Sequence, residues 1–371
     1  MRRRQKRLGS CWRELQMKPV IRLSEKIREL SKEFESVKIM HLCGTHEDTI
    51  TKYNLRSLLP ENISLLSGPG CPVCITPDED IQMVMHLLEK ENITLATFGD
   101  MARVPFQGKS LFTLRAEGYD IRIVYSIFDS LKLAESSDRP VVHFAIGFET
   151  TMPSTAIALL DEKENFYVFS AHRFFIPAVH ALCENTTVDA FINPGHVSTI
   201  IGVKPYREIL KKYGIPQVIA GFEPEDVMLA IYLLLEAMSD GRREVINEYS
   251  RAVKEEGNVR ALEAMDRVFR KEDWSWRGLG VVKGSGGALA KRFEQFDARK
   301  VFEDAFADFQ PVEDKSKRLC RCGDVLKGIA TPKDCPLFMK ACNPRNPVGA
   351  CMVSVEGTCN IWATSGTSRT Q

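Results

Sequence analysis

The chain has 371 residues, more than a single ordinary hydrophobic core uses, so we expect two or three domains. Hydrophobic residues make up 44% of it and charged residues 27%, which is typical of globular proteins. The formal net charge of +1 gives no electrostatic argument for binding nucleic acid or an anionic membrane surface.

Nothing in the sequence predicts export or membrane insertion. Residues 2–7 are basic, but no apolar core of a signal peptide follows them. The longest apolar helix candidate, near residues 227–238, is too short to span a bilayer. We therefore expect a cytoplasmic protein, and in a reducing cytosol cysteines more often bind metals or carry out redox chemistry than form structural disulfides.

Apolar runs alternate with amphipathic segments along most of the chain. A first helix is predicted at residues 21–34, with Ile21, Leu23, Ile27 and Leu30 on one face. Strands that alternate with helices predict parallel sheets with right-handed crossovers. The strand candidates are residues 38–42, 64–67, 94–98, 121–125, 141–146, 166–169, 190–192 and 217–220.

A polar stretch at residues 135–139 divides these strands into two sets of four. We therefore expect an α/β protein with two Rossmann-like parallel domains, residues 36–134 and 135–240, flanking a cleft. Residues 1–35 and 241–371 would form a third domain, mainly helical and irregular, which the N-terminal helix joins to the rest.

Two segments of the second half are less informative. The chain is charged and predicted to be helical from residue 225 to about residue 270. The glycine-rich stretch at residues 278–287 is interpreted as a connector.

Polar motifs directly follow four of the predicted strands. In open parallel sheets the carboxyl ends of the strands face the binding crevice, so we expect these four loops to converge on one cleft. The motifs are Cys43-Gly44-Thr45-His46-Glu47, Gly68-Pro69-Gly70-Cys71-Pro72-Val73-Cys74, Gly147-Phe148-Glu149-Thr150-Thr151 and Asn193-Pro194-Gly195-His196.

The cysteine motifs each allow two interpretations. Cys43 and His46, next to Glu47, could be the thiolate and imidazole ligands of a soft metal, or a buried thiol and a helix-capping histidine. Cys71 and Cys74 have the spacing of a redox motif or of half a zinc site. The glycines and prolines around this pair favour a tight, exposed turn.

The other two motifs are weaker signals. The Gly147 loop could be a phosphate turn, but it lacks the lysine of a Walker motif and the three glycines of a dinucleotide site. His196 could simply cap a helix that begins near Val197.

Six of the eleven cysteines lie between residues 320 and 359, in a segment interrupted by prolines and glycines. Such a segment loops repeatedly, which suits a chain wrapped around a metal centre. Six thiols are two more than a four-iron cluster needs, so a cluster plus a redox pair fits the count. Structural zinc is the alternative, but the segment has no two-residue knuckle, and the spacing of Cys320 and Cys322 is awkward for one tetrahedral ion.

The sequence resembles the HypD family of [NiFe]-hydrogenase maturation factors. The resemblance covers residues from about 40 to 360, with all motifs in the order of the family. It is carried by the Cys43, Cys71 and Gly147 motifs above, by Pro194-Gly195-His196-Val197-Ser198, by Gly221-Phe222-Glu223-Pro224 and by Pro347-Val348-Gly349-Ala350-Cys351-Met352-Val353-Ser354.

The resemblance implies a redox-active assembly scaffold rather than a conventional turnover enzyme. An iron centre with two cyanides and one carbon monoxide would be built on it. A small chaperone of the HypC type would work with it, a HypE-type protein would donate cyanide, and the hydrogenase large-subunit precursor would be served indirectly. Neither nucleic acid nor membrane is an implied partner.

The resemblance also implies residue roles. Cys43 would be the iron-holding thiolate with His46 beside it, and Cys71 and Cys74 would be redox-active or ligand-handling thiols. A [4Fe–4S] cluster would be held by Cys320, Cys335, Cys342 and Cys359, with Cys322 and Cys351 as a nearby redox pair, as in ferredoxin-dependent thioredoxin reductase. A chain of thiols would then carry electrons toward Cys43.

Some positions depart from the family pattern. Met339 and Asn343 stand where glycine and threonine are usual, and Asn360-Ile361-Trp362 replaces a small stretch containing tyrosine. Cys11 and Cys183 match no motif.

Two other functions compete with the scaffold. A thiol–disulfide reductase would use the same cluster but leave the Cys43 and Gly147 motifs without a role. An α/β binding protein with structural zinc is disfavoured by the cysteine spacing.

Overall fold

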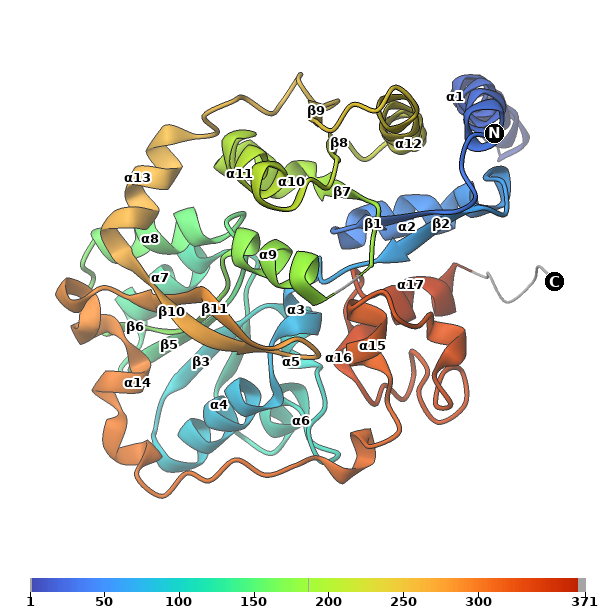
Figure 1. The fold of residues 1–371 in the computed structure, drawn as a ribbon. Helices are drawn as coiled ribbons and strands as arrows, with labels where there is room; N and C mark the ends of the chain where they lie inside the picture. Colours follow the sequence, from blue (N-terminus) through green and yellow to red (C-terminus); the bar gives the residue numbers. More distant parts are fainter. Residues whose placement is uncertain (1, 186, 366–371) are drawn as a thin grey trace.

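The structure, a computed structural model, describes residues 2–185 and 187–365, with side chains from Met17 onward, so the side chain of Cys11 lies outside it. Two parallel sheets and a β-hairpin make up its strands (Figure 1). The mixed α/β class and the parallel sheets are confirmed. No helix in the described residues has the length and apolar character needed to cross a membrane.

The first sheet has five parallel strands in the order β2-β1-β7-β8-β9. They are β1 (Val37–His41), β2 (Ile63–Ser67), β7 (Ala190–Pro194), β8 (Gln217–Ala220) and β9 (Val245–Asn247). The second sheet has four parallel strands in the order β4-β3-β5-β6. They are β3 (Thr94–Thr97), β4 (Ile121–Ile123), β5 (Val141–Gly147) and β6 (Phe166–His172).

The expected division into two sets of four consecutive strands is wrong. The chain leaves the first sheet after β2, builds the whole second sheet, and returns at β7, which pairs with β1 through Ile39 and Ala190. The polar stretch at residues 135–139 is only the exposed end of α7 (Ile127–Ser136) and the turn into β5. The expected domain limits, residues 36–134, 135–240, and 1–35 with 241–371, were based on this strand grouping. That these segments fold independently stays a prediction.

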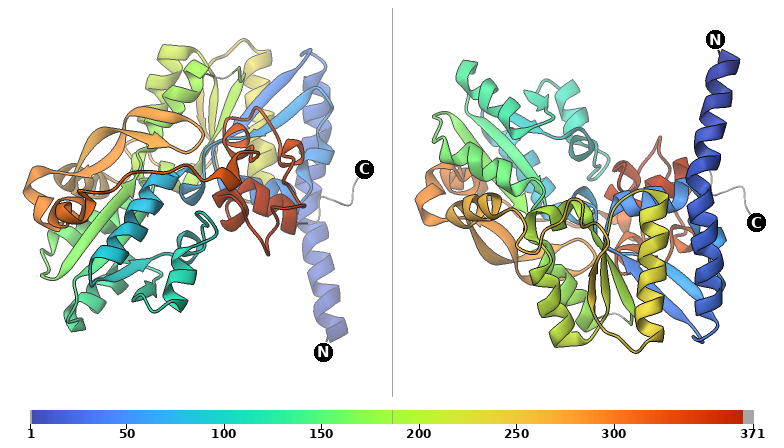
Figure 2. Two further views of the ribbon diagram at one scale, coloured as in Figure 1. Left: turned by 90° about the horizontal axis from the view of Figure 1, so that it is seen from below. Right: turned by 90° about the horizontal axis from the view of Figure 1, so that it is seen from above.

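The long N-terminal helix α1 (Arg2–Ser31) packs beside α12 (Pro224–Ser239) on one face of the first sheet (Figure 2). Its buried stripe contains Val20, Ser24 and Ile27, at helical spacing, whereas Ile21 of the expected apolar face is 50% exposed. The helix thus starts earlier than predicted and presents a slightly different face to the core.

The glycine-rich stretch is a strand rather than the expected connector. It forms β11 (Gly280–Leu289), which pairs with β10 (Phe269–Trp276) in an antiparallel hairpin against β6 and α9. A Cβ at Gly286 would collide with the Trp274 ring, and one at Gly287 would lie 2.9 Å from Met152 Cε. The glycines therefore serve close packing.

Helices and helical turns connect the strands. The remaining α-helices are α2 (Gly44–Lys52), α3 (Pro72–Ile75), α4 (Asp78–Lys90), α5 (Gly99–Ala102), α6 (Leu111–Ala116), α8 (Met152–Leu160), α9 (Phe175–Asn185), α10 (Gly195–Ile201), α11 (Lys204–Tyr213), α13 (Val259–Val268) and α14 (Ala298–Val301). The 3-10 helices are η1 (Leu55–Leu58), η2 (Lys291–Phe296), η3 (Glu303–Phe306), η4 (Lys315–Lys317) and η5 (Pro332–Asp334).

The cysteine-rich region forms short helices joined by turns, as its prolines and glycines predict. Its α-helices are α15 (Cys322–Leu326), α16 (Ala350–Val353) and α17 (Thr358–Thr364). Helix α17 packs on α2, and α16 packs on α3, so this region lies against the ends of β1 and β2 (Figure 1). Of the predicted third domain, residues 245–247 belong instead to the first sheet, as β9.

Candidate functional site

The carboxyl ends of strands from both sheets open into one cleft of about 850 Å³. All four loops that the sequence places at strand ends contribute to it, through residues such as Cys43, Pro72, Phe148 and His196. The segment between α16 and α17 adds a further wall with Val355. The cleft that we expected between two parallel sheets is therefore present.

Cys43 lies where β1 ends and α2 begins, and it lines the cleft with only 7% of its surface exposed. Burial and the neighbouring Glu356 raise the pKa of its thiol to about 11, and the N–H groups of His46 and Thr45 at the helix start lower it less. The N–H groups at a helix start favour a thiolate, but here burial outweighs them. A metal cation that binds the sulfur would release the thiol proton.

Glycines bring three segments together around Cys43. A Cβ at Gly70 would lie 2.5 Å from Cys43 Cα, so only glycine lets the loop before Cys71 come so close. A Cβ at Gly44 would collide with Glu356. Cys43 is thus enclosed by the loop after β2 on one side and by the cysteine-rich region on the other.

His46 is fully buried and does not line the cleft. Its Nε2 lies 2.9 Å from the carbonyl oxygen of Gly221, and its ring stacks on Phe222. Burial, with a smaller contribution from His41, lowers the pKa of the imidazole to about 3. The other ring nitrogen of His46, Nδ1, is buried without a hydrogen-bond partner among the described residues, and the role of His46 as an iron ligand stays a prediction.

Glu47 has a structural role that the sequence did not reveal. Its buried carboxylate accepts hydrogen bonds from several elements at once. The partners are Thr51 Oγ1 at 2.7 Å, Arg56 Nη1 and Nη2 at 2.8 Å, Ser67 Oγ at 2.5 Å, His41 Nε2 at 2.8 Å and Trp362 Nε1 at 2.8 Å. Burial alone would raise the pKa of Glu47, but Arg56 and His41 lower it well below the usual value. These bonds use both oxygens, so Glu47 ties the Cys43 helix to its surroundings.

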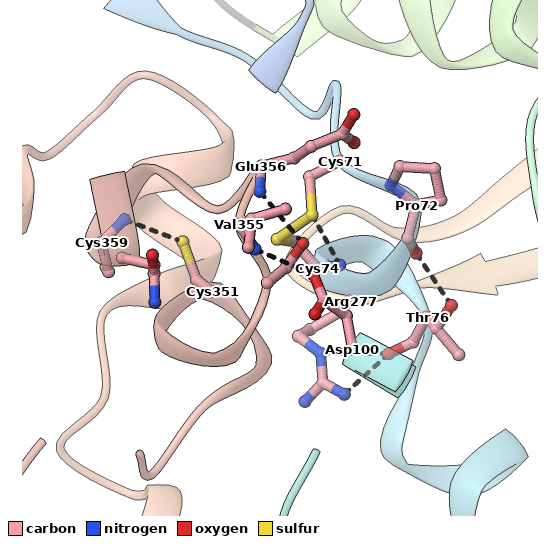
Figure 3. Close-up of a disulfide and its surroundings, with 12 residues drawn as sticks. Cys71, Pro72, Cys74, Thr76, Asp100, Arg277, Cys351, Val355, Glu356 and Cys359 are labelled. Carbon is pink, nitrogen blue, oxygen red and sulfur yellow. Dashed lines mark hydrogen bonds between the residues drawn. A yellow bond between two sulfur atoms is a disulfide. The ribbon is translucent and has the colours of Figure 1, made fainter. Parts of the chain in front are cut away.

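Cys71 and Cys74 form a disulfide at the start of α3, with their Cα atoms 5.2 Å apart (Figure 3). The Cys71 sulfur also accepts a hydrogen bond of 3.2 Å from the Cys74 N–H. Both residues are buried, so the expected exposed turn is wrong: Pro72 and Val73 line the cleft, and the sulfurs lie behind them. This disulfide fits the interpretation of the motif as a redox pair better than its interpretation as half a zinc site.

All six cysteines of the C-terminal region line one small cavity. They are Cys320, Cys322, Cys335, Cys342, Cys351 and Cys359. The Cys322 thiol is free and interacts with both Cys320 and Cys351, and the free Cys351 thiol also interacts with Cys359. The hydrogen bond with Cys351 lowers the pKa of Cys359, but burial and the charges of the other cysteines raise it overall. Burial, with smaller contributions from Cys320 and Cys335, also raises the pKa of Cys342.

Soft sulfur donors gathered around one cavity fit an iron–sulfur cluster, with two thiols left over. Among the described residues, no group of three or more His, Cys, Asp or Glu side chains has the arrangement that holds a single metal ion. Which four cysteines hold the cluster stays a prediction.

The cysteine-rich region also reaches the cleft directly. Val355 donates its backbone N–H to Asp100 Oδ2 at 2.9 Å (Figure 3). Glu356 lies next to Cys43 and lines the cleft with it. Burial and the charge of Asp100 raise the pKa of Glu356. The sequence reasoning missed both acids. Asp100 is the second residue after the predicted strand at residues 94–98, and a position just after a strand is the signal that identified the other cleft loops.

The Gly147 loop is a tight turn that the motif residues build themselves. Gly147 has a φ of 136°, and a Cβ there would collide with Thr151 Oγ1, which donates to Ile146 O at 3.1 Å. Glu149 is buried away from the cleft and accepts the Phe175 N–H at 3.0 Å. Gly147 and Thr151 are thus explained by the turn, and Glu149 by its bond to the start of α9.

Comparison with known proteins assigns the chain to a family of maturation factors. The family model described as HypD, hydrogenase formation hypA family, matches residues 18–366. A putative hydrogenase expression/formation protein of Methanocaldococcus jannaschii is 45% identical over 344 residues, covering 91% of this chain and 94% of that protein. Hydrogenase maturation factor HypD of Escherichia coli K12 is 41% identical over 356 residues, covering 92% and 94%.

The chain therefore belongs to the HypD family of hydrogenase maturation factors, and the resemblance seen in the sequence is confirmed.

Proposed function

We propose that this protein is the scaffold on which the iron centre of [NiFe]-hydrogenases, with its two cyanides and one carbon monoxide, is assembled. The observation that carries the proposal is Cys43, a thiol in the wall of a cleft between two sheets, enclosed by the disulfide loop and the cysteine-rich region. Thiolate is a suitable anchor for low-spin ferrous iron with strong-field ligands. The iron is the cargo of this site.

The cysteine-rich region would hold a [4Fe–4S] cluster as its resident cofactor. We propose Cys320, Cys335, Cys342 and Cys359 as its ligands from the family resemblance, and the cavity that all six cysteines line supports a cluster at this place. When bound, such a cluster supplies electrons one at a time.

Cys322 and Cys351 would pass these electrons on as a thiol pair. Reduction of the Cys71–Cys74 disulfide takes two electrons and two protons, and oxidation of two thiols to a new disulfide releases the same number. Helix α16, which carries Cys351, packs on α3, which carries Cys74 and begins directly after Cys71, and this contact supports such an exchange. The reduced thiols of Cys71 and Cys74 would then be available for redox chemistry in the cleft next to Cys43.

The partners that we propose follow from the family. A small HypC-type chaperone would share the iron, a HypE-type protein would donate cyanide, and the hydrogenase large-subunit precursor would be reached through the chaperone. We propose a cytoplasmic location for this assembly.

A thiol–disulfide oxidoreductase, similar to ferredoxin-dependent thioredoxin reductase, is the second candidate. The disulfide beside the cysteine-rich region favours it. It does not account for Cys43, whose thiol lines the cleft apart from both pairs.

Replacement of Cys43 by alanine separates the two functions. The scaffold predicts that Cys43→Ala keeps its fold and C-terminal cluster but loses hydrogenase maturation in cells that lack the native copy. Cys183→Ala is the matched control, because Cys183 is also a free cysteine but lines neither the cleft nor the cysteine cavity. Normal maturation by the Cys43→Ala protein would contradict the scaffold and favour the oxidoreductase.

A further inference from the structure

The histidine that faces the cleft is His196, rather than the His46 favoured by sequence. His196 lies in the first turn of α10 and lines the same cleft as Cys43. Neither of its ring nitrogens has a hydrogen-bond partner among the described residues. Both stay free for a ligand.

Packing holds the imidazole of His196 in place without using its nitrogens. The ring stacks on Phe222, with centroids 3.8 Å apart and planes at 22°. Phe222 is held in turn by an edge contact with Tyr249 and by His46, which stacks on it from the core. A Cβ at Gly195 would lie 2.7 Å from Ala220 O, so the backbone before His196 also packs closely on β8. A polar group fixed in this way loses little entropy when it binds a ligand.

The walls around His196 are largely apolar. They include Leu42, Phe98, Ile123, Ile146, Phe148, Val197 and Ile200. A bound cyanide has a good hydrogen-bond acceptor at its nitrogen, whereas the oxygen of carbon monoxide accepts only weakly. Taking the cyanide nitrogen out of water in such surroundings costs free energy unless a protein donor replaces the water.

Four of the other polar side chains of the cleft are less suited to donate. Asp100 and Glu356 accept hydrogen bonds when ionised, and the Thr151 and Thr199 hydroxyls already donate to backbone carbonyl groups. Burial lowers the pKa of His196, which favours a neutral ring with one N–H.

We propose that His196 donates a ring N–H hydrogen bond to the nitrogen of a cyanide ligand on the iron centre that Cys43 holds. The hydrogen bond gives the cleft a means to favour cyanide over carbon monoxide at that position. This inference rests on the proposed scaffold function.

Infrared spectroscopy of the full-length protein, isolated anaerobically with its small chaperone, tests the hydrogen bond. His196→Phe keeps a ring that can stack on Phe222 but removes the donor, so at least one cyanide stretching band should shift. The small change of that band in D₂O, which an N–H donor causes, should be lost as well. His196→Gln supplies an amide N–H and should retain a D₂O-sensitive band. Cyanide bands of His196→Phe at the native positions, with the native response to D₂O, would overturn the inference.

The same spectra separate this inference from the function on which it rests. If the native protein shows no cyanide or carbonyl bands, the scaffold function itself is contradicted. If the native protein shows these bands and their positions do not change in the His196 variants, only the hydrogen bond is contradicted. Thermal midpoints and thiol counts show whether each variant is folded. If His196→Phe does not fold, His196→Met and His196→Gln make the comparison, because they are similar in size and only glutamine has a donor.

Discussion

The indole nitrogen of Trp362 donates a hydrogen bond of 2.8 Å to the buried carboxylate of Glu47. Trp362 lies in α17, the helix that also carries Cys359, and Glu47 lies in α2, which starts next to Cys43. Arg56 strengthens the contact, since it binds Glu47 and also lies 5.4 Å from the centre of the Trp362 ring. This hydrogen bond thus joins the helix that carries Cys359, a proposed cluster ligand, to the helix that begins directly after Cys43.

Glu47→Gln should destabilise the fold strongly. The substitution removes the charge that Arg56 pairs with and leaves donors of a buried network without a matching acceptor, a loss of about 3 kcal/mol in the free energy of unfolding. Trp362→Phe removes only one of the hydrogen bonds and should cost about 1 kcal/mol. Urea unfolding of the two variants measures the difference. Equal losses in both would show that the carboxylate network contributes no more than its bond to Trp362.

Glu149 should make the protein less stable as the pH rises. Burial raises the pKa of its carboxyl to about 7, although the N–H of Phe175 lowers it. Because the folded state holds this proton more tightly, the contribution is complete below the usual value of 4.5 and is lost as the pH rises toward about 7.

Glu149→Gln removes this titration. The thermal midpoint of the variant should therefore rise relative to that of the native protein between about pH 5 and about pH 8, by the equivalent of about 1–3 kcal/mol. If the thermal midpoints of the variant and the native protein differ by the same amount at both ends of this range, the raised pKa of the buried Glu149 carboxyl is contradicted.

Serine substitutions should divide the six cysteines of the shared cavity into two groups. Changing Cys320, Cys335, Cys342 or Cys359 to serine should abolish the brown colour and lower the iron content from about four atoms per chain to near zero. Cys322→Ser and Cys351→Ser are the matched controls from the same cavity and should retain the cluster. A complete cluster in any of the first four variants would contradict the ligand assignment.

The thiol pairs should respond to oxidation in a defined way. Cys71 and Cys74 form a disulfide and should be protected from alkylation after unfolding in the absence of reductant. Cys322 and Cys351 are free neighbours here and should become protected only after oxidation. Mass spectrometry of alkylated peptides measures both pairs. Free alkylation of Cys322 and Cys351 in air-exposed protein with an intact cluster would contradict their role as a redox pair.

Much of the local structure is predictable because buried parallel strands appear as short apolar runs. The strand candidates correspond to β1–β8, and the motifs after β1, β2, β5 and β7 do meet at one cleft. Strand partners were not predictable. Nothing in the local pattern shows that Ile39 pairs with Ala190, because all strands of the second sheet lie between these residues in the sequence. β9 was missed because it lies in the charged segment from residue 225 to about residue 270, which was predicted to be helical throughout.

The sequence predicted which types of residue form the site, but not which of their side chains face the cleft. Cys43 lines the cleft as expected, whereas the choice between His46 and His196 depends on which ring the packing around Phe222 leaves exposed. Glu356 belongs to the cleft only because the cysteine-rich region folds back on the Cys43 loop. Such long-range contacts are decided by the tertiary fold.

The most direct test of the central claim is the infrared spectrum of the protein isolated anaerobically with its small chaperone from cells that supply all maturation partners. The scaffold predicts cyanide and carbonyl stretching bands in the native complex, present in the Cys183→Ala control and absent from Cys43→Ala with its C-terminal cluster intact. A native complex with a full cluster but without these bands, or a Cys43→Ala complex that retains them, would contradict the assembly of the iron centre on Cys43.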